Sequence, residues 1–456
     1  MKNTFLLKSI SDIHKSFVDG SCTPEDIASE CISAYEKYNS SYFPFVCFDS
    51  ERLLQQAGET SKRLSQKQQL LNLDGIPVGV KDIFNTADFP TQMGSPLWKG
   101  FTPGNDARTV FNVKEQGALI PGKTVTAEFA VHTLNETINP HDETRTPGTS
   151  SSGSAVAIAL GIVPVALGTQ TAASIVRPAS FCGVYGCKPS FGLIPRTGML
   201  KTTDSLDSVG FFTSRYEDIR RVFEVLRVHG PNYPKSHQAF QDPARVRKPE
   251  IRPWRVAFAK THTWENAPQY AKSAIVAWLN KVSATGDIEV IEPALPEQIA
   301  DAHRIHSTIY DKTLAYYFAK EFERSELISP IMNDMIRHGN EITPEEYLSV
   351  LEEQSELCLL MDEFCSGYDV LISLSTAGSA PPRHQIEEPD PSLMWTLTHL
   401  PVVSVPVFLA PDGLPFGLQI TSRRYNDYLL LNFTDHLRSL GLIPEGVNPL
   451  SKPCLL

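Results

Sequence analysis

Residues 147–154 have the sequence Pro147-Gly148-Thr149-Ser150-Ser151-Ser152-Gly153-Ser154, and a short stretch with helical character, 154–160, follows them. This stretch is nearly nonpolar all round, so we expect it to be a central, buried helix. Short apolar runs separated by turns precede and follow it and are typical of buried strands. Strands that alternate with helices predict an α/β fold with a mixed sheet between helix layers. The predicted strands are 76–80, 118–120, 162–167, 370–374, 402–407 and 418–420, and the other predicted helices are 23–38, 51–70 and 107–116.

The composition excludes several classes of protein. The formal net charge is 41 − 52 = −11 over 456 residues. An acidic chain is poorly suited to nucleic acid, which calls for a basic face. No run of about 18 apolar residues occurs, so no transmembrane helix is expected. The N-terminus does not resemble a signal peptide and the eight cysteines are scattered, which favours free thiols in a cytoplasmic protein.

Three side chains have the chemistry of a serine hydrolase. Ser150 lies in the stretch quoted above, and Ser174 follows 24 residues later at the end of Gly168-Thr169-Gln170-Thr171-Ala172-Ala173-Ser174. Lys81 lies upstream in Gly75-Ile76-Pro77-Val78-Gly79-Val80-Lys81-Asp82. A serine hydroxyl is almost fully protonated at neutral pH and needs a base. The apolar neighbours of Lys81 would lower its pKa enough for the lysine to be that base.

Other interpretations of the serine-rich stretch remain open at this point. Such stretches are often loops or helix caps, and helix N-termini also attract phosphate. However, the chain has neither G-x-x-x-x-G-K-[ST] nor a G-x-G-x-x-G that follows a strand. Residues 148–152 also lack the final glycine of the G-x-S-x-G hydrolase elbow.

Taken together, the lysine segment and the two serine segments resemble the amidase signature family. That family shows G-[IV]-P-x-x-[VI]-K-D, then P-G-G-S-S-G-G-S, then G-x-D-T-G-G-S-I-R-x-P-A. The resemblance covers nearly the whole chain, and only the helical segment from 215 to 368 matches loosely. Further matching landmarks are 181–189, 205–210, 400–406 and 413–419.

The resemblance implies an amidase mechanism. Ser174 would attack a carboxylic or carbamoyl amide and form an acyl-enzyme, which water hydrolyses to acid and amine or ammonia. Ser150 would relay the proton between Ser174 and neutral Lys81. Members of the family hold the relay serine in a cis peptide, which here would be Thr149–Ser150.

The residues before Ser174 are implied to bind the oxyanion, and here the chain departs from the family pattern. The implied donors are the backbone N–H groups of Thr171, Ala172, Ala173 and Ser174. The two alanines replace a glycine pair, so a positive φ at either position would strain the turn. Gln170 replaces an aspartate, and an arginine stands three residues after the nucleophile instead of two.

The resemblance also implies one amidase signature domain over 1–456. Its expected parts are N-terminal helices in 1–70, a catalytic core in 71–215 and 369–450, and a variable helical segment on the substrate side in 216–368. We expect a small-molecule amide substrate and neither cofactor, metal, nucleic acid nor membrane, with a homodimer left open. Two alternatives stay open: a glutaminase-type subunit of an amidotransferase complex, and a weakly active or inactive homologue that acts in binding.

Some polar and aromatic residues have two interpretations each. Asp207 could orient the catalytic site or close a turn. Tyr310, Tyr317 and Phe318 could line a substrate pocket or form a helix packing face. The histidines, including His132, have no spacing typical of a metal site and are expected at structural or surface positions.

Overall fold

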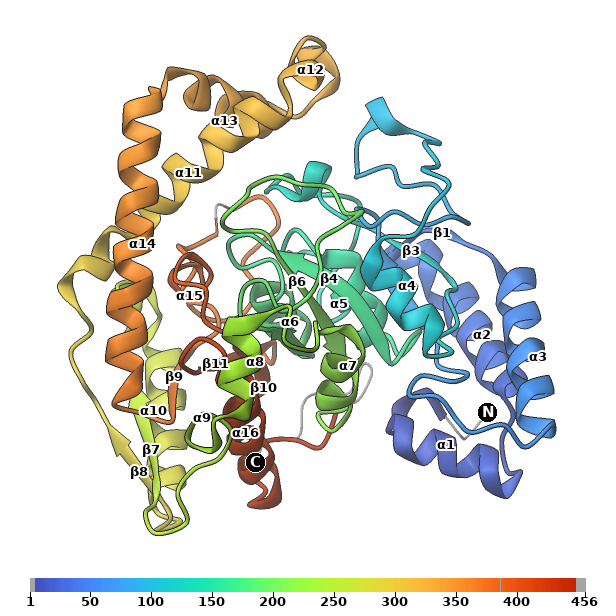
Figure 1. The fold of residues 1–456 in the computed structure, drawn as a ribbon. Helices are drawn as coiled ribbons and strands as arrows, with labels where there is room; N and C mark the ends of the chain where they lie inside the picture. Colours follow the sequence, from blue (N-terminus) through green and yellow to red (C-terminus); the bar gives the residue numbers. More distant parts are fainter. Residues whose placement is uncertain (1–4, 386, 448–456) are drawn as a thin grey trace.

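One mixed sheet organises the chain in the computed structural model, which describes residues 5–385 and 387–447 (Figure 1). It has eleven strands over these residues. β2 pairs in parallel with β3 and β4, whereas β6 pairs antiparallel with β4 and β5. The predicted α/β fold with a mixed sheet is therefore confirmed. Across the sheet the strands are β1 (Phe45–Phe48), β3 (Gly122–Thr124), β2 (Val78–Lys81), β4 (Val165–Gln170), β6 (Ser208–Thr213), β5 (Tyr185–Lys188), β10 (Val402–Leu409), β11 (Pro415–Thr421), β9 (Val370–Leu374), β7 (Trp254–Phe258) and β8 (Ile288–Ile291).

Helices pack around this sheet and extend beyond it (Figure 1). They are α1 (Ile10–Asp19), α2 (Pro24–Tyr42), α3 (Ser50–Ser65), α4 (Arg108–Glu115), α5 (Ser152–Ala159), α6 (Val176–Cys182), α7 (Asp218–Leu226), α8 (Pro234–Gln241), α9 (Pro243–Val246), α10 (Gln269–Ser283), α11 (Ala302–Tyr317), α12 (Ala319–Phe322), α13 (Pro330–Glu341), α14 (Pro344–Ser366), α15 (Leu393–Leu397) and α16 (Asp427–Ser439). None of the helices in the described residues has the length and apolar character needed to cross a membrane.

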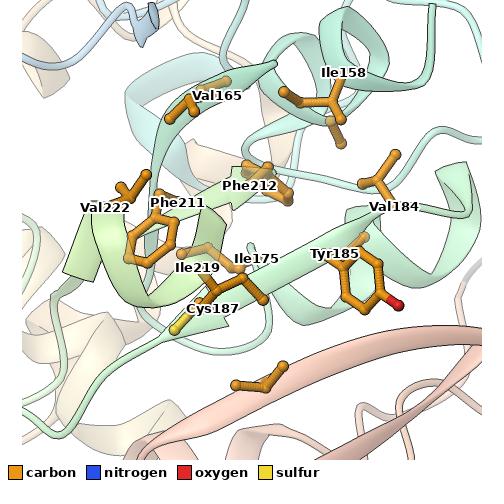
Figure 2. Packing of buried hydrophobic residues seen from close by; sticks show 14 of the residues in the cluster. Ile158, Val165, Ile175, Val184, Tyr185, Cys187, Phe211, Phe212, Ile219 and Val222 are labelled. Atoms are coloured by element: carbon orange, nitrogen blue, oxygen red, sulfur yellow. The ribbon is translucent and has the colours of Figure 1, made fainter. Parts of the chain in front are cut away.

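The predicted central helix is α5, and every one of its residues is buried. It begins at Ser152, two residues earlier than predicted. Gly153 allows this close packing, because a Cβ there would lie 2.4 Å from the Val125 nitrogen and 2.5 Å from the Pro44 oxygen. Figure 2 shows the apolar layer around it, to which Ile158, Val165 and Phe212 contribute.

Local sequence signals explain where two of the N-terminal helices begin or end. Thr23 and Asp26 form a capping box at the start of α2, and Pro24 occupies the first helical turn. α3 ends at Ser65 instead of the predicted residue 70. Lys67 adopts a left-handed conformation with φ of 58°, which does not continue a right-handed helix.

Two further predictions differ from the structure. In 118–120 only Leu119 forms an isolated bridge, and the strand β3 begins after Pro121, which has no N–H to donate. The segment 216–368 is not only helical, because β7 and β8 join the central sheet through parallel pairing to β9. Buried side chains such as Val256 explain why β7 extends the sheet core.

Candidate active site

Lys81 ends β2 and is fully buried. Its Nζ donates to Ser150 Oγ at 2.8 Å, to Ser151 Oγ at 2.9 Å and to Thr169 Oγ1 at 2.9 Å. As an ammonium, Lys81 would donate to all three hydroxyl groups; as a neutral amine, it donates to two of them and offers its lone pair to the third. The structure therefore brings Lys81 and Ser150 together directly.

The environment of Lys81 favours its neutral form. Burial lowers the pKa of Lys81 well below its usual range, and the negative charge of Asp207 opposes this shift in part. Desolvation disfavours an ammonium in an apolar interior, so the lone pair becomes available at lower pH.

Ser150 lies on a tight turn before α5. The Thr149–Ser150 peptide is cis, as expected from the resemblance. Gly148 precedes it with φ of 81°, and a Cβ at Gly148 would lie 2.9 Å from Pro178 Cα. The Ser150 carbonyl accepts a hydrogen bond from the Ala127 N–H at 3.1 Å. Glycine is thus required at 148 both for the backbone conformation and for the close approach.

Ser174 lies in the turn that joins β4 to α6 and is 5% exposed. Gln170 closes this turn, because its Oε1 accepts from the N–H groups of Ile175 at 2.9 Å and Val176 at 3.0 Å. Its Nε2 donates to Thr396 Oγ1 at 2.9 Å. An ionised aspartate could accept these bonds but not donate the last one, so the amide suits this surrounding.

The two alanines before Ser174 fit the turn. Neither Ala172 nor Ala173 has a positive φ, so the strain that such a φ would cause does not arise. The Ala172 carbonyl accepts from Thr396 Oγ1 at 2.6 Å, and Thr171 Oγ1 donates to Asp207 Oδ1 at 2.8 Å. The first two residues of the stretch, Thr171 and Ala172, are therefore held by buried hydrogen bonds.

Asp207 both closes a turn and touches the site. Its carboxylate accepts from the Thr202 and Thr203 N–H groups at 2.8 and 3.0 Å and from Thr202 Oγ1 at 2.6 Å. The same carboxylate holds Thr171. The two interpretations of Asp207 from the sequence are thus both supported by its contacts.

Arg177 forms a buried charge cluster that sequence reasoning missed. Its guanidinium binds Glu387 and donates to Thr149 Oγ1 at 3.3 Å, and its Nε and Nη2 donate to Asp390 at 3.1 and 2.5 Å. Burial raises the pKa of Asp390 to about 6, although Arg177 opposes this shift. The carboxylates lie more than 200 positions away in the chain, and no local pattern marks them as partners of Arg177.

A cavity of about 840 Å³ adjoins these elements. Thr149, Ala172 and Arg177 line it on the side of the serine turns, and α11 and α13 line it elsewhere. Tyr310 belongs to this wall, so the pocket interpretation applies to it. Tyr317 instead donates to Asp204 at 2.8 Å.

Phe318 and two histidines have different roles in the same region. Phe318 packs on Phe129 with ring centroids 4.7 Å apart, which is the helix packing role. His132 and His306 also line the cavity, and burial lowers their pKa values to about 3 and about 4. In the described part of the chain no group of three or more His, Cys, Asp or Glu side chains is placed to hold a metal ion.

Comparison with known proteins places the chain among enzymes of amide chemistry. A family model described as Amidase matches residues 26–431. A glutamyl-tRNA(Gln) amidotransferase subunit of Nostoc punctiforme is 28% identical over 466 residues, which cover 91% of this chain and 94% of that protein. The corresponding mitochondrial protein of Rattus norvegicus is 28% identical over 489 residues, with coverage of 93% and 92%.

Solved structures share the fold at lower identity. A chain from an inhibitor-bound vestigial protein complex, related to the origins of an s-triazine catabolic enzyme, has a TM-score of 0.86 and 23% identity, covering 97% of this chain and all of that one. Native peptide amidase from Stenotrophomonas maltophilia has a TM-score of 0.80 and 21% identity, with coverage of 98% and 99%. These likenesses establish the architecture of the chain.

Proposed function

Because the chain belongs to the amidase family, we propose that it hydrolyses the C–N bond of a linear carboxylic or carbamoyl amide through an acyl-enzyme on Ser174. The observation that carries this proposal is the buried hydrogen bond of 2.8 Å between Lys81 Nζ and Ser150 Oγ. A lysine with a lowered pKa beside a hydroxyl group is the base that a serine nucleophile requires.

In the first half-reaction, Ser174 Oγ attacks the carbonyl carbon and gives its proton to Ser150. Ser150 passes its own proton to the lone pair of Lys81 Nζ. When the tetrahedral intermediate collapses, the C–N bond breaks and Lys81 returns the proton through Ser150 to the leaving nitrogen. The amine or ammonia leaves, and the acyl group stays on Ser174 as an ester.

In the second half-reaction, water attacks the ester carbonyl and gives a proton to the same relay. The bond between the acyl carbon and Ser174 Oγ then breaks, and the proton returns to Ser174. The products are the acid and the free serine, so each turnover consumes one water.

The neighbours of Lys81 support a defined direction for this relay. Ser151 Oγ donates to the Thr169 carbonyl at 3.1 Å, so it accepts a hydrogen bond from Lys81. Thr169 Oγ1 takes a second N–H of the amine. With both N–H groups of a neutral amine engaged, the lone pair is left for the hydroxyl group of Ser150.

We propose that the backbone N–H groups of Thr171, Ala172, Ala173 and Ser174 stabilise the oxyanion. The Thr171 and Ala172 contacts to Asp207 and Thr396 hold this stretch before substrate binds. Donors fixed in advance stabilise a developing charge without reorganisation at the moment of reaction. We also propose that the segment 216–368 selects the substrate, because α11 and α13 from this segment form part of the cavity wall.

A glutaminase-type component of an amidotransferase complex is the second candidate, because relatives named as amidotransferase subunits match over more than nine-tenths of this chain. Under this hypothesis glutamine hydrolysis would require partner proteins. Copurification of the chain with such partners, together with glutaminase activity only in the complex, would favour it.

A fluorophosphonate probe tests the first proposal. We expect covalent labelling of Ser174, detected by mass spectrometry of the digested protein, and no labelling of the Ser174→Ala variant. Folded protein that stays unlabelled would contradict the hydrolase function in both forms.

A further inference from the structure

One face of α11 presents polar side chains to the cavity of about 840 Å³. Positions three and four residues apart lie on the same side of a helix. α11 and α13 pack against each other, and Figure 1 shows them side by side. The lining residues of α11 that share this spacing are His303, Arg304, His306, Ser307, Tyr310 and Asp311.

His306 fixes this face relative to the serine turn. Its Nε2 donates to the Thr171 carbonyl oxygen at 2.9 Å. Thr171 is the first residue of the stretch that ends at Ser174. Asp311 follows five residues further along α11. A helix rises 1.5 Å per residue, so Asp311 lies about 7.5 Å further along the axis, away from that contact.

Asp311 has an unsatisfied carboxylate oxygen beside the cavity. The residue is 7% exposed, and its Oδ2 accepts from His338 Nδ1 at 2.6 Å. Its Oδ1 is buried and has no hydrogen-bond partner, and the same is true of His303 Nε2 in the same wall. A buried acceptor without a donor destabilises the protein. A bound molecule with N–H groups would supply the missing donor.

The charges of the wall favour a cation as this donor. Arg177 is engaged by two carboxylates, Arg304 pairs with Glu353, and Arg383 donates to two backbone carbonyl groups at 2.6 and 2.7 Å. The arginines among the described residues of the wall therefore already have partners. The carboxylates of the wall outnumber them and are Asp311, Glu387, Glu388 and Asp390.

We propose that Asp311 is a specificity residue that binds a cationic N–H group of the substrate, an ammonium or a guanidinium, remote from the amide bond that Ser174 attacks. This inference deepens the proposed function and rests on it. It also predicts that substrates with an anionic group at the same place are disfavoured.

The test compares amides with and without an ammonium group in the purified full chain. 5-Aminopentanamide carries the ammonium on the acyl side, and hexanamide is its uncharged isostere. N-(4-aminobutyl)acetamide carries it on the amine side, and N-pentylacetamide is its isostere. Both hydrolysis and protection of Ser174 from fluorophosphonate are measured, so a slowly cleaved amide still reports binding.

We expect the wild type to prefer the cationic member of at least one pair. The preference should be about ten- to a hundred-fold in kcat/KM or in the protection of Ser174 from fluorophosphonate, because a hydrogen bond to a charged group contributes in this range. Asp311→Asn should remove most of this preference, through a raised KM for the cationic member of the pair. Asp334→Asn, which alters a carboxylate on α13 with a side chain that is 74% exposed, is the matched control and should keep the preference.

Two results would overturn the inference. One is equal use of the cationic and uncharged members of both pairs by the wild type, which does not depend on how well any variant folds. The other is an unchanged preference in folded Asp311→Asn. If Ser174 is not labelled by fluorophosphonate, the proposed function itself fails; labelled protein without a cation preference contradicts only the role of Asp311.

Discussion

Lys81 Nζ and Ser150 Oγ lie 2.8 Å apart in the interior, although 69 residues separate them in the chain. Replacement of Lys81 by Met keeps much of the side-chain volume and removes the base. We expect kcat for amide hydrolysis to fall by about 10²- to 10⁴-fold, the range for loss of a general base. Steady-state kinetics check this result, with Lys99→Met, a lysine outside this cluster, as control. Turnover that survives in folded Lys81→Met would refute the lysine as base.

The pH dependence of kcat/KM should report the deprotonation of Lys81. Burial lowers the pKa of Lys81 well below its usual range, and the charge of Asp207 opposes the shift. Activity should therefore rise with pH and level off below the ordinary lysine value of about 10.4. Asp207→Asn removes the opposing charge, so the rising limb should move to lower pH.

A purely structural effect of Asp207→Asn would lower the height of the pH profile without moving it. Such a result, or a rising limb at the ordinary pKa of lysine, would show that Lys81 does not titrate as proposed. Labelling by fluorophosphonate across the same pH range provides a readout that does not involve product release.

Replacement of Arg177 should lower the free energy of unfolding more than replacement of a surface arginine. Arg177→Met leaves Glu387 and Asp390 without their cation, and removal of one partner from a buried ion pair costs about 3–5 kcal/mol. Arg304→Met is the control, because the Arg304 side chain is 52% exposed and such pairs contribute about 0–1 kcal/mol. Urea unfolding measures both, and equal losses would contradict the cluster as a structural element.

Gly153 should be intolerant of any side chain. The Cβ of alanine would lie within 2.5 Å of backbone atoms of Val125 and Pro44, and backbone cannot move aside cheaply. We expect Gly153→Ala to destabilise the protein by about 1–3 kcal/mol, as overpacking does. Gly58→Ala in α3 meets one atom, at 3.8 Å, and should be stabilising by about 0.5–1 kcal/mol. Thermal unfolding of the two variants should move in opposite directions.

Asp218 should make the folded protein less stable as pH rises. Burial raises the pKa of Asp218 to about 7, against about 3.9 in an unfolded chain. Between these values the folded state binds the proton and the unfolded state does not, so the free energy of unfolding falls from pH 4 to pH 7 and then levels off. Asp218→Asn should remove this slope, and urea unfolding at pH 5 and pH 8 measures it. A slope that persists in the variant would assign the effect to other groups.

Elements whose signals are local could be predicted from the amino-acid sequence. The cap of α2 at Thr23, the apolar helix α5 and the serine turn around Ser150 all depend on residues within one or two helical turns. The α/β type of fold could also be predicted, because strands that alternate with apolar helices can pack in only a few ways. The predicted boundaries of an element are less exact where a single residue interrupts the backbone pairing. Pro121, which has no N–H to donate, separates the predicted strand 118–120 from the observed β3.

Which distant groups meet is visible only in the folded chain. Arg177 and Glu387 are 210 residues apart, and His306 lies 135 residues from the carbonyl of Thr171 that it contacts. Whether an alanine strains a turn is likewise a matter of the φ angle imposed by its surroundings, and at Ala172 that angle is not positive. A local pattern specifies helices and turns, whereas burial, hydrogen-bond partners and the charge of a cavity wall arise only when separate segments pack together.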